Sequence, residues 1–147
     1  MGREEQVTGS EQETAAVARK LAKRLGAGEV VLLYGTLGAG KTAFVRGILQ
    51  YFDASVAVTS PTYTLINVYP TTPAIYHFDL YRLRDENDLL DVGFEEYLDA
   101  GGIVLVEWAE KCGRLKPERG WEVYLTIEGE SRRHISLGRI EDDNTGA

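Results

Sequence analysis

The sequence predicts a single α/β domain that contains buried strands of the kind found in parallel sheets. Two continuously apolar runs, at residues 30–34 and 103–106, are typical of strands buried on both faces, as in parallel sheets. Segments with helical spacing of apolar residues alternate with strand-like segments, which is the pattern of α/β domains. A chain of 147 residues, 44% hydrophobic and 27% charged, fits one globular domain. We expect this domain at residues 1–138, followed by a frayed acidic tail at 139–147.

The first helix is expected over residues 11–25. Ser10 and Glu13 have the spacing of a capping box, and apolar residues then recur at helical intervals. Gly26 suits the end of this helix. The opposite side is basic, and it is either a solvated face or a surface that meets a partner. Its residues are Arg19, Lys20, Lys23 and Arg24.

The other elements follow from hydrophobic patterns and turn residues. Two further helical segments are expected, at residues 43–51 and at 85–98 with an interruption near Gly93. A half-exposed strand alternates polar and apolar residues and returns through a turn at 129–131. The expected strands lie at residues 30–34, 55–58, 63–69, 74–80, 103–106, 121–127 and near 135–137.

Charge and cysteine content restrict the class of protein. A net charge of −7 argues against a free-standing nucleic-acid binder, because phosphate contacts dominate such binding. In a nucleic-acid pathway, we therefore expect a partner to hold the nucleic acid. The single cysteine, Cys112, is typical of a reducing cytoplasm, and one Cys with two His argues against a structural zinc site. The chain shows neither a signal-peptide pattern nor a membrane-length apolar run, so we expect a cytoplasmic protein without a membrane partner.

Residues 35–42 match the phosphate-loop pattern G-x-x-x-x-G-K-[ST] in full. Polyphosphate requires several converging backbone N–H groups, and glycines let the backbone approach its oxygens. The start of the following helix adds partial positive charge. Lys41 is expected to reach the outer phosphates, and the Thr42 hydroxyl to hold Mg²⁺. The expected nucleotide-binding residues are Gly35, Thr36, Leu37, Gly38, Ala39, Gly40, Lys41, Thr42 and Ala43.

A phosphate loop requires an acidic partner for its metal, and Glu107 is the candidate. In such folds this partner ends an apolar strand beside the strand that precedes the loop. Glu107 ends the run at residues 103–106, with Glu in place of the commoner Asp. We expect Glu107 to bind Mg²⁺ directly or through water. A strand-end carboxylate in a salt bridge would give the same pattern.

Three further features are ambiguous when each is taken alone. Local alternation places His77, Asp79 and Tyr81 on one face of a strand, where Asp79 either orients water, binds Mg²⁺ through water or is structural. The Ser-Pro-Thr-Tyr segment at residues 60–63 is either a nucleotide-sensing switch loop or a turn before a strand. Trp108 belongs either to the core or to the surroundings of the nucleotide.

Taken together, these motifs resemble the TsaE family of bacterial ATPases that act in tRNA threonylcarbamoyladenosine biosynthesis. The resemblance extends over residues 14–137 and depends on four blocks that occur in the same order. The set is much more specific than any one block. The blocks are Gly-x-Leu-Gly-Ala-Gly-Lys-Thr at 35–42, Ser-Pro-Thr-Tyr at 60–63, His-x-Asp-x-Tyr-Arg at 77–82 and Val-Glu-Trp at 106–108.

The resemblance implies a compact P-loop NTPase domain, with a mostly parallel sheet flanked by helices and a small antiparallel edge. It implies binding of ATP with Mg²⁺ and slow hydrolysis. It also implies action beside the TsaB–TsaD pair, in which TsaD transfers the threonylcarbamoyl group to tRNA adenosine. The family member does not perform this transfer, and ATP turnover is thought to reset the partner complex. Contact with tRNA is then indirect, through the partner.

The resemblance also implies roles for individual residues. Lys41 contacts phosphates, and Thr42 and Glu107 serve Mg²⁺. Asp79 is required for hydrolysis, and Thr62 belongs to the switch-like loop. Lys41, Asp79 and Thr62 are thus the expected catalytic residues.

One position departs from the pattern of the family. Thr36 stands where the family usually has Asp after the first loop glycine. This position precedes the phosphate cradle, so ATP binding is expected to persist. The change affects any contact that the Asp makes to catalytic groups or to a partner.

Three alternatives remain at this level. A small-molecule or nucleotide kinase shares the loop, but it requires an acceptor pocket and usually an arginine-rich lid, for which Arg82 and Arg84 are the close pair. A GTPase would carry an Asn-Lys-x-Asp guanine reader, and no Asn of this chain is followed by Lys. A nucleotide-gated binding module without useful hydrolysis differs from the ATPase in turnover alone.

Overall fold

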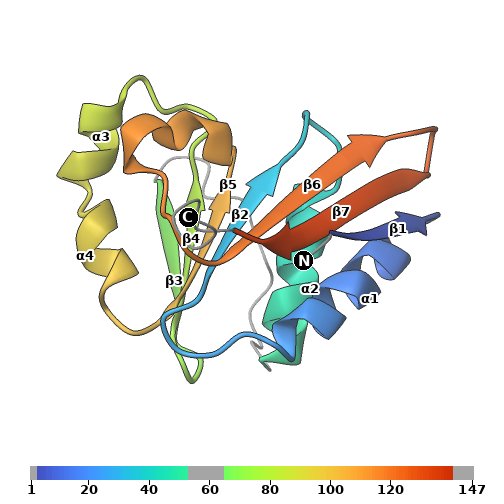
Figure 1. Ribbon diagram of the computed structural model, residues 1–147, viewed down its shortest axis with the longest axis horizontal. Helices are drawn as coiled ribbons and strands as arrows, with labels where there is room; N and C mark the ends of the chain where they lie inside the picture. The colour runs from blue at the N-terminus through green and yellow to red at the C-terminus, as the bar shows by residue number, and fades with distance from the viewer. Residues whose placement is uncertain (1–2, 53–64, 141–147) are drawn as a thin grey trace, which may run out of the picture.

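A twisted sheet lies at the centre of the fold, and its strands follow the order β1-β7-β6-β2-β5-β4-β3 (Figure 1). The computed structural model describes residues 3–52 and 65–140, and within them the sheet has seven strands. The strands are β1 (Glu4–Thr8), β2 (Val30–Tyr34), β3 (Ile66–Tyr69), β4 (Ile75–Asp79), β5 (Ile103–Glu107), β6 (Trp121–Ile127) and β7 (Arg133–Arg139). The helices are α1 (Glu11–Ala22), α2 (Lys41–Tyr51), α3 (Glu86–Asp91), α4 (Phe94–Leu98) and the 3-10 helix η1 (Ala109–Leu115).

The centre of the sheet is parallel, which confirms the predicted fold class. β2 lies between β5 and β6 and runs parallel to both, and β4 runs parallel to β5. Antiparallel pairs occur on both sides of this centre, with β7 and β1 on one side and β3 on the other. The parallel centre brings the carboxyl ends of β2, β4 and β5 to one edge, where α/β sheets bind ligands.

The apolar run of β2 is explained by burial on both of its faces. Val31 and Leu33 belong to a core that includes the buried sides of α1 and α2. Val30 and Leu32 belong to a second core, which packs against α3, α4 and η1. The helices therefore form one layer on each side of the sheet, as Figure 1 shows.

Helices α1 and α2 approach each other closely at Gly47. A Cβ atom at this position would lie 2.7 Å from the Ala18 Cβ and would also overlap the Ala15 carbonyl. Any larger residue must therefore push the two helices apart. This contact fixes α2, and with it the loop that precedes α2, against the rest of the domain.

Several boundaries differ from the sequence predictions. The first helix ends at Ala22 rather than at 25, α2 begins at Lys41, and β3 begins at Ile66. The expected strand at 55–58 lies outside the described residues. Strand β7 continues to Arg139, one residue past the expected end of the domain.

Two elements were not predicted from the sequence. Strand β1 pairs with β7 along the edge of the sheet, and most of its side chains remain exposed, so it has no apolar pattern. The 3-10 helix η1 contains Gly113 in a non-helical conformation, which interrupts any helical spacing. Both elements depend on tertiary contacts more than on local sequence.

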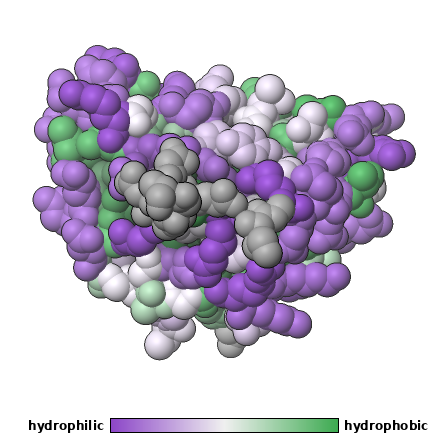
Figure 2. Space-filling model, viewed as in Figure 1, coloured by the Kyte–Doolittle hydropathy of each residue, from purple (hydrophilic) through white to green (hydrophobic). Residues whose placement is uncertain are grey.

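The face of the molecule in Figure 2 is mostly hydrophilic, and its hydrophobic residues form small separate patches. None of the helices within residues 3–52 and 65–140 has the length and apolar character required to cross a membrane.

Candidate active site

The phosphate-loop residues connect β2 to α2, as the sequence predicts. Gly38 and Gly40 have φ values of 82° and 107°, in the left-handed region that strongly favours glycine. Gly40 is the N-cap of α2, so the N–H groups of the first helical turn face the loop. This is the backbone arrangement that binds phosphate groups at a helix N-terminus.

The Lys41 side chain is buried and turned back over its own loop. Its Nζ donates hydrogen bonds to the carbonyl oxygens of Gly35 and Thr36, the second at 3.0 Å, and its exposed fraction is 5%. Nζ also lies 4.0 Å from the ring centroid of Trp108. Burial lowers the pKa of Lys41, and the nearby Glu107, Glu110 and Asp79 carboxylates oppose this shift. The ammonium group is thus held where a phosphate would meet it.

Trp108 adopts an unusual backbone conformation for a residue other than glycine. Its φ is 59° and its ψ is 44°, and it directly follows the last residue of β5. Its ring lies 4.9 Å from that of Tyr81 and faces the Lys41 ammonium. Trp108 is partly buried and packs against the second core, which agrees with the core interpretation, and it also lies beside the loop. Its place in the surroundings of the nucleotide stays a prediction.

Two carboxylates stand beside the loop at the ends of neighbouring strands. Asp79 and Glu107 are register partners in the parallel pair of β4 and β5. Glu107 is 3% exposed, whereas Asp79 is half-buried and accepts a hydrogen bond from the Tyr81 N–H at 3.0 Å. Burial raises the pKa of Asp79, although that hydrogen bond lowers it. Tyr81 lies beyond β4, so the expectation that it shares a strand face with Asp79 was wrong.

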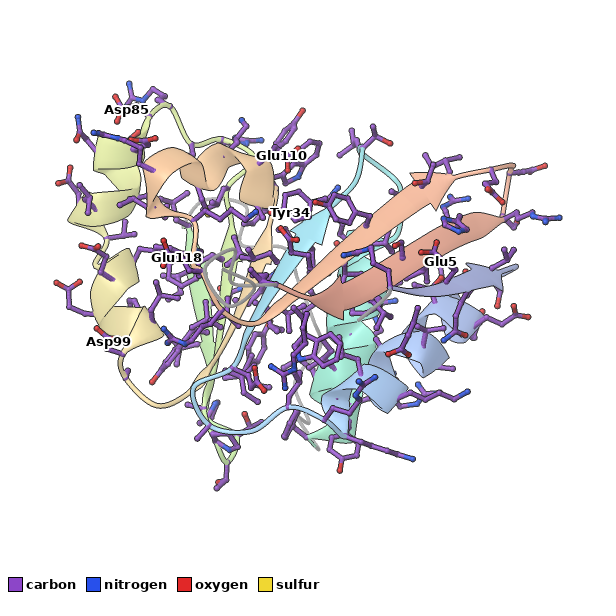
Figure 3. All side chains as sticks on the ribbon, viewed as in Figure 1. Glu5, Tyr34, Asp85, Asp99, Glu110 and Glu118 are labelled. Carbon is purple, nitrogen blue, oxygen red and sulfur yellow. The ribbon has the colours of Figure 1, made fainter. Side chains whose placement is uncertain are left out.

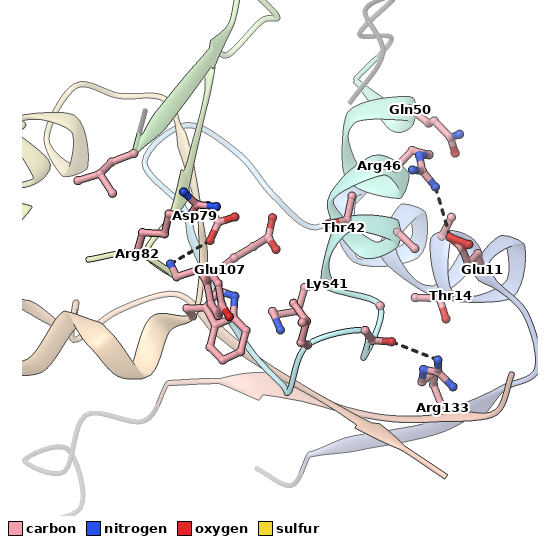
Figure 4. Close-up of a pocket in the computed structure, with 18 of the residues that line it drawn as sticks. Glu11, Thr14, Lys41, Thr42, Arg46, Gln50, Asp79, Arg82, Glu107 and Arg133 are labelled. Atoms are coloured by element: carbon pink, nitrogen blue, oxygen red, sulfur yellow. Dashed lines mark hydrogen bonds and ion pairs between the residues drawn. The ribbon is translucent and has the colours of Figure 1, made fainter. Parts of the chain in front are cut away.

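A cavity of about 1500 Å³ opens over the loop, the two carboxylates and the start of α1 (Figure 4). Three predicted nucleotide-binding residues, Gly35, Thr36 and Ala39, do not line it, and Thr62 lies outside the described residues. The predicted residues that line the cavity are Leu37, Gly38, Gly40, Lys41, Thr42, Ala43, Asp79 and Glu107.

Sequence reasoning missed the far wall of this cavity. Glu11 and Thr14 of α1 line it, and Arg46 of α2 lies 3.8 Å from the Glu11 carboxylate. Arg133 of β7 donates a hydrogen bond to the Gly38 carbonyl at 3.1 Å (Figure 4). The capping box located the start of α1, but no local signal indicated that this start faces the loop. Nor does any local signal connect Arg133 with Gly38, because their contact depends on the fold of the hairpin.

The oxygen donors at the loop fit a magnesium ion that is shared with a phosphate. Thr42 and Glu107 supply the hydroxyl and carboxylate oxygens that Mg²⁺ prefers. The described residues contain no group of three or more His, Cys, Asp or Glu side chains arranged to hold a metal. This is compatible with Mg²⁺, which proteins usually hold through one or two carboxylates together with substrate phosphates and water.

Comparison with known proteins identifies the family. Residues 8–135 match the family described as threonylcarbamoyl adenosine biosynthesis protein TsaE. The chain belongs to the TsaE family. TsaE proteins take part in the biosynthesis of threonylcarbamoyladenosine in tRNA.

Relatives named tRNA threonylcarbamoyladenosine biosynthesis protein TsaE share much of the sequence. The Haemophilus influenzae protein is 47% identical over 80% of this chain and 73% of its own length. The Bacillus subtilis protein is 35% identical over 88% of this chain and 81% of its own length. The crystal structure of Bacillus subtilis YdiB has a TM-score of 0.78 and 28% identity, and the match covers 95% of this chain and 86% of that one. The fold and family expected from the four sequence blocks are thereby confirmed.

Proposed function

We propose that this TsaE protein is a Mg²⁺-dependent ATPase whose turnover supports threonylcarbamoyladenosine formation in tRNA. The observation that carries the proposal is the arrangement around Lys41. A glycine loop ahead of α2, a buried ammonium and two strand-end carboxylates meet at one cavity. These parts suit the binding of a nucleoside triphosphate and the support of phosphoryl transfer, which depends mainly on positioning and electrostatics.

Each group has a distinct task in this proposal. The loop N–H groups and Lys41 bind phosphate oxygens, for which Lys41 exchanges its carbonyl partners for stronger anionic ones. Thr42 and Glu107 hold Mg²⁺, which neutralises charge on the phosphates when it is bound. Asp79, at the same edge, orients the attacking water through its carboxylate. We assign Thr62 to a switch-like loop that responds to the bound nucleotide.

The proposed partner is the TsaB–TsaD pair, in which TsaD carries out the transfer to tRNA. The net charge of −7 supports this division, since an acidic chain gains little from tRNA phosphates by itself. P-loop proteins without an arginine finger turn over slowly, on the order of 10⁻⁴ to 10⁻² per second. We therefore propose that the partner stimulates hydrolysis and remains the component that contacts tRNA, all in the cytoplasm.

The deciding experiment measures Mg²⁺-dependent ATP turnover by the chain alone and with TsaB–TsaD and tRNA. The proposal expects slow turnover alone, and strong stimulation with repeated rounds of tRNA modification in the mixture. Absence of stimulation would favour a nucleotide-gated binding module. Transfer of phosphate to a small acceptor instead of water would favour a kinase.

Lys41→Ala tests the phosphate loop directly. This variant should lose ATP binding, because the loop loses its buried positive charge. Saturating Mg-ATP should raise the unfolding temperature of the unmodified protein, since a ligand at 100 times its Kd stabilises by about 2.7 kcal/mol. Lys20→Ala, on the exposed side of α1, should retain this increase. An undiminished increase in Lys41→Ala would refute the phosphate-loop assignment.

A further inference from the structure

A buried histidine contacts the proposed magnesium ligand. His77 Nε2 lies 2.6 Å from Glu107 Oε2, and both side chains are almost completely buried, with 0% and 4% exposed. The contact crosses from β4 to β5, where His77 is the register partner of Leu105, two residues before Glu107. The imidazole therefore reaches along the sheet toward the edge that carries the phosphate loop.

The chemistry of the two side chains determines which of them donates the hydrogen bond. A carboxylate can only accept, so Nε2 must carry the proton and donate it to Glu107. The other ring nitrogen, Nδ1, is buried and has no hydrogen-bond partner among residues 3–52 and 65–140. A bare Nδ1 leaves one lone pair unused, which is less unfavourable than a buried N–H without an acceptor. His77 is thus suited to one task, which is to hold Oε2.

The Glu107 carboxylate is bound asymmetrically. The described residues supply His77 as the hydrogen-bond partner of Oε2, and they supply none for Oε1. Glu107 also follows four buried apolar residues of β5, so the backbone that carries it has little freedom to move. One oxygen is anchored by His77, while the described residues leave the other without a partner at the cavity that Glu107 lines together with Lys41 and Thr42.

We propose that His77 is a positioning residue that orients the Glu107 carboxylate toward Mg²⁺. This inference rests on the proposed function, because it assigns His77 a task at that same site. Hydrogen-bond partners of metal ligands commonly contribute 10- to 100-fold to metal affinity by fixing the ligand in place. His77 acts through Glu107 and does not itself touch nucleotide or metal.

The test compares His77→Gln with His77→Asn. A Gln amide nitrogen can occupy the place of Nε2 and donate to Glu107, whereas the shorter Asn places its amide near Nδ1. We expect the Mg²⁺ concentration at half-saturation of ATP binding to rise about tenfold in His77→Asn, and by less than about threefold in His77→Gln. Equal effects of the two variants, with both still folded by circular dichroism, would overturn the inference.

A second arm separates positioning from a general effect on the fold. In a Glu107→Gln background, His77→Asn should produce no additional rise in the half-saturating Mg²⁺ concentration, because the group that it positions is already altered. A full additional rise would assign His77 a structural role instead. In metal-free protein, ¹⁵N spectra of His77 should show a protonated Nε2, and a bare Nε2 would contradict the proposal.

The same measurements distinguish failure of this inference from failure of the proposed function. If Glu107→Gln alone leaves the Mg²⁺ dependence of ATP binding unchanged, then the magnesium assignment itself fails. If Glu107→Gln raises the half-saturating concentration but His77→Asn does not, only the role of His77 is overturned. Glu118→Gln is the matched control for Glu107→Gln, since Glu118 is exposed and does not line the cavity.

Discussion

Burial opposes the charges of two residues at the site. It lowers the pKa of Lys41 and raises the pKa of Asp79, while each charge attracts the other. Groups with perturbed pKa values in a cavity are typical of functional sites. The arrangement suits ligand binding better than it suits the stability of the free protein.

Asp79→Asn should therefore stabilise the free protein at neutral pH. The unfolded chain ionises Asp79 near its ordinary pKa of 3.8, and the folded protein does so at higher pH. Stability contributed by the protonated carboxyl is lost as pH rises through that window. The difference in unfolding temperature between Asp79→Asn and the unmodified protein should thus appear above pH 3.8 and persist at pH 7.

Thermal unfolding at several pH values checks this expectation. In Asp79→Asn, the amide oxygen of the new side chain can still accept the Tyr81 N–H, so the local turn is preserved. Asp99→Asn is the control, because Asp99 (labelled in Figure 3) is exposed just after α4 and does not line the cavity. The same variant also tests the role proposed for Asp79 in hydrolysis. If Asp79→Asn still binds ATP but no longer hydrolyses it, that role is supported. If Asp79→Asn hydrolyses ATP at the normal rate, Asp79 is a structural residue.

At the scale of elements, the phosphate loop is held from two directions. Helix α2 is packed on α1 at Gly47, and Arg133 at the start of β7 donates to the Gly38 carbonyl. Arg133 also donates to the carbonyls of Gly129 and Arg132, so one guanidinium connects the β6–β7 turn to the loop. The cavity is consequently assembled by contacts between elements, and no single segment contains it.

Gly47→Ala should destabilise the protein by about 1–3 kcal/mol, the usual effect of overpacking. The added methyl group would overlap the Ala15 carbonyl and would lie 2.7 Å from the Ala18 Cβ. Denaturant unfolding measures the change, with Gly26→Ala as control because nothing lies within 4 Å of a Cβ there. If Gly47→Ala lowers the free energy of unfolding no more than Gly26→Ala does, the two helices can move apart without loss of stability.

At the scale of the whole molecule, the sequence predicts the parts that depend on local pattern. The apolar runs located β2 and β5, and the glycine spacing located the loop between β2 and α2. Glu107 and Asp79 were predicted as separate candidates, and their meeting follows from parallel register. Strand β1 and the contact of Arg133 with the loop were not predictable, because both depend on which segments pair across more than 90 residues.

Cys112 provides a measure of the integrity of the whole fold. Its thiol extends from the buried side of η1 into the core, and burial raises its pKa to about 12. The reactive thiolate is then scarce at pH 8, so alkylation of the native protein should be at least about 100-fold slower than that of the unfolded chain. Mass spectrometry of iodoacetamide-treated protein checks this, and equally rapid labelling of both states would contradict the burial.

The order of the strands also determines when the proposed nucleotide site can form during synthesis. β2 is made early, but its two neighbours, β5 and β6, lie more than 65 residues further along the chain. Pairing of such distant segments is slow and leaves apolar edges exposed in the meantime. A nascent chain that has not yet extended past β6 therefore contains the complete loop motif but lacks the paired strands that hold the loop in place. Most of this domain must therefore leave the ribosome before the proposed nucleotide site can form.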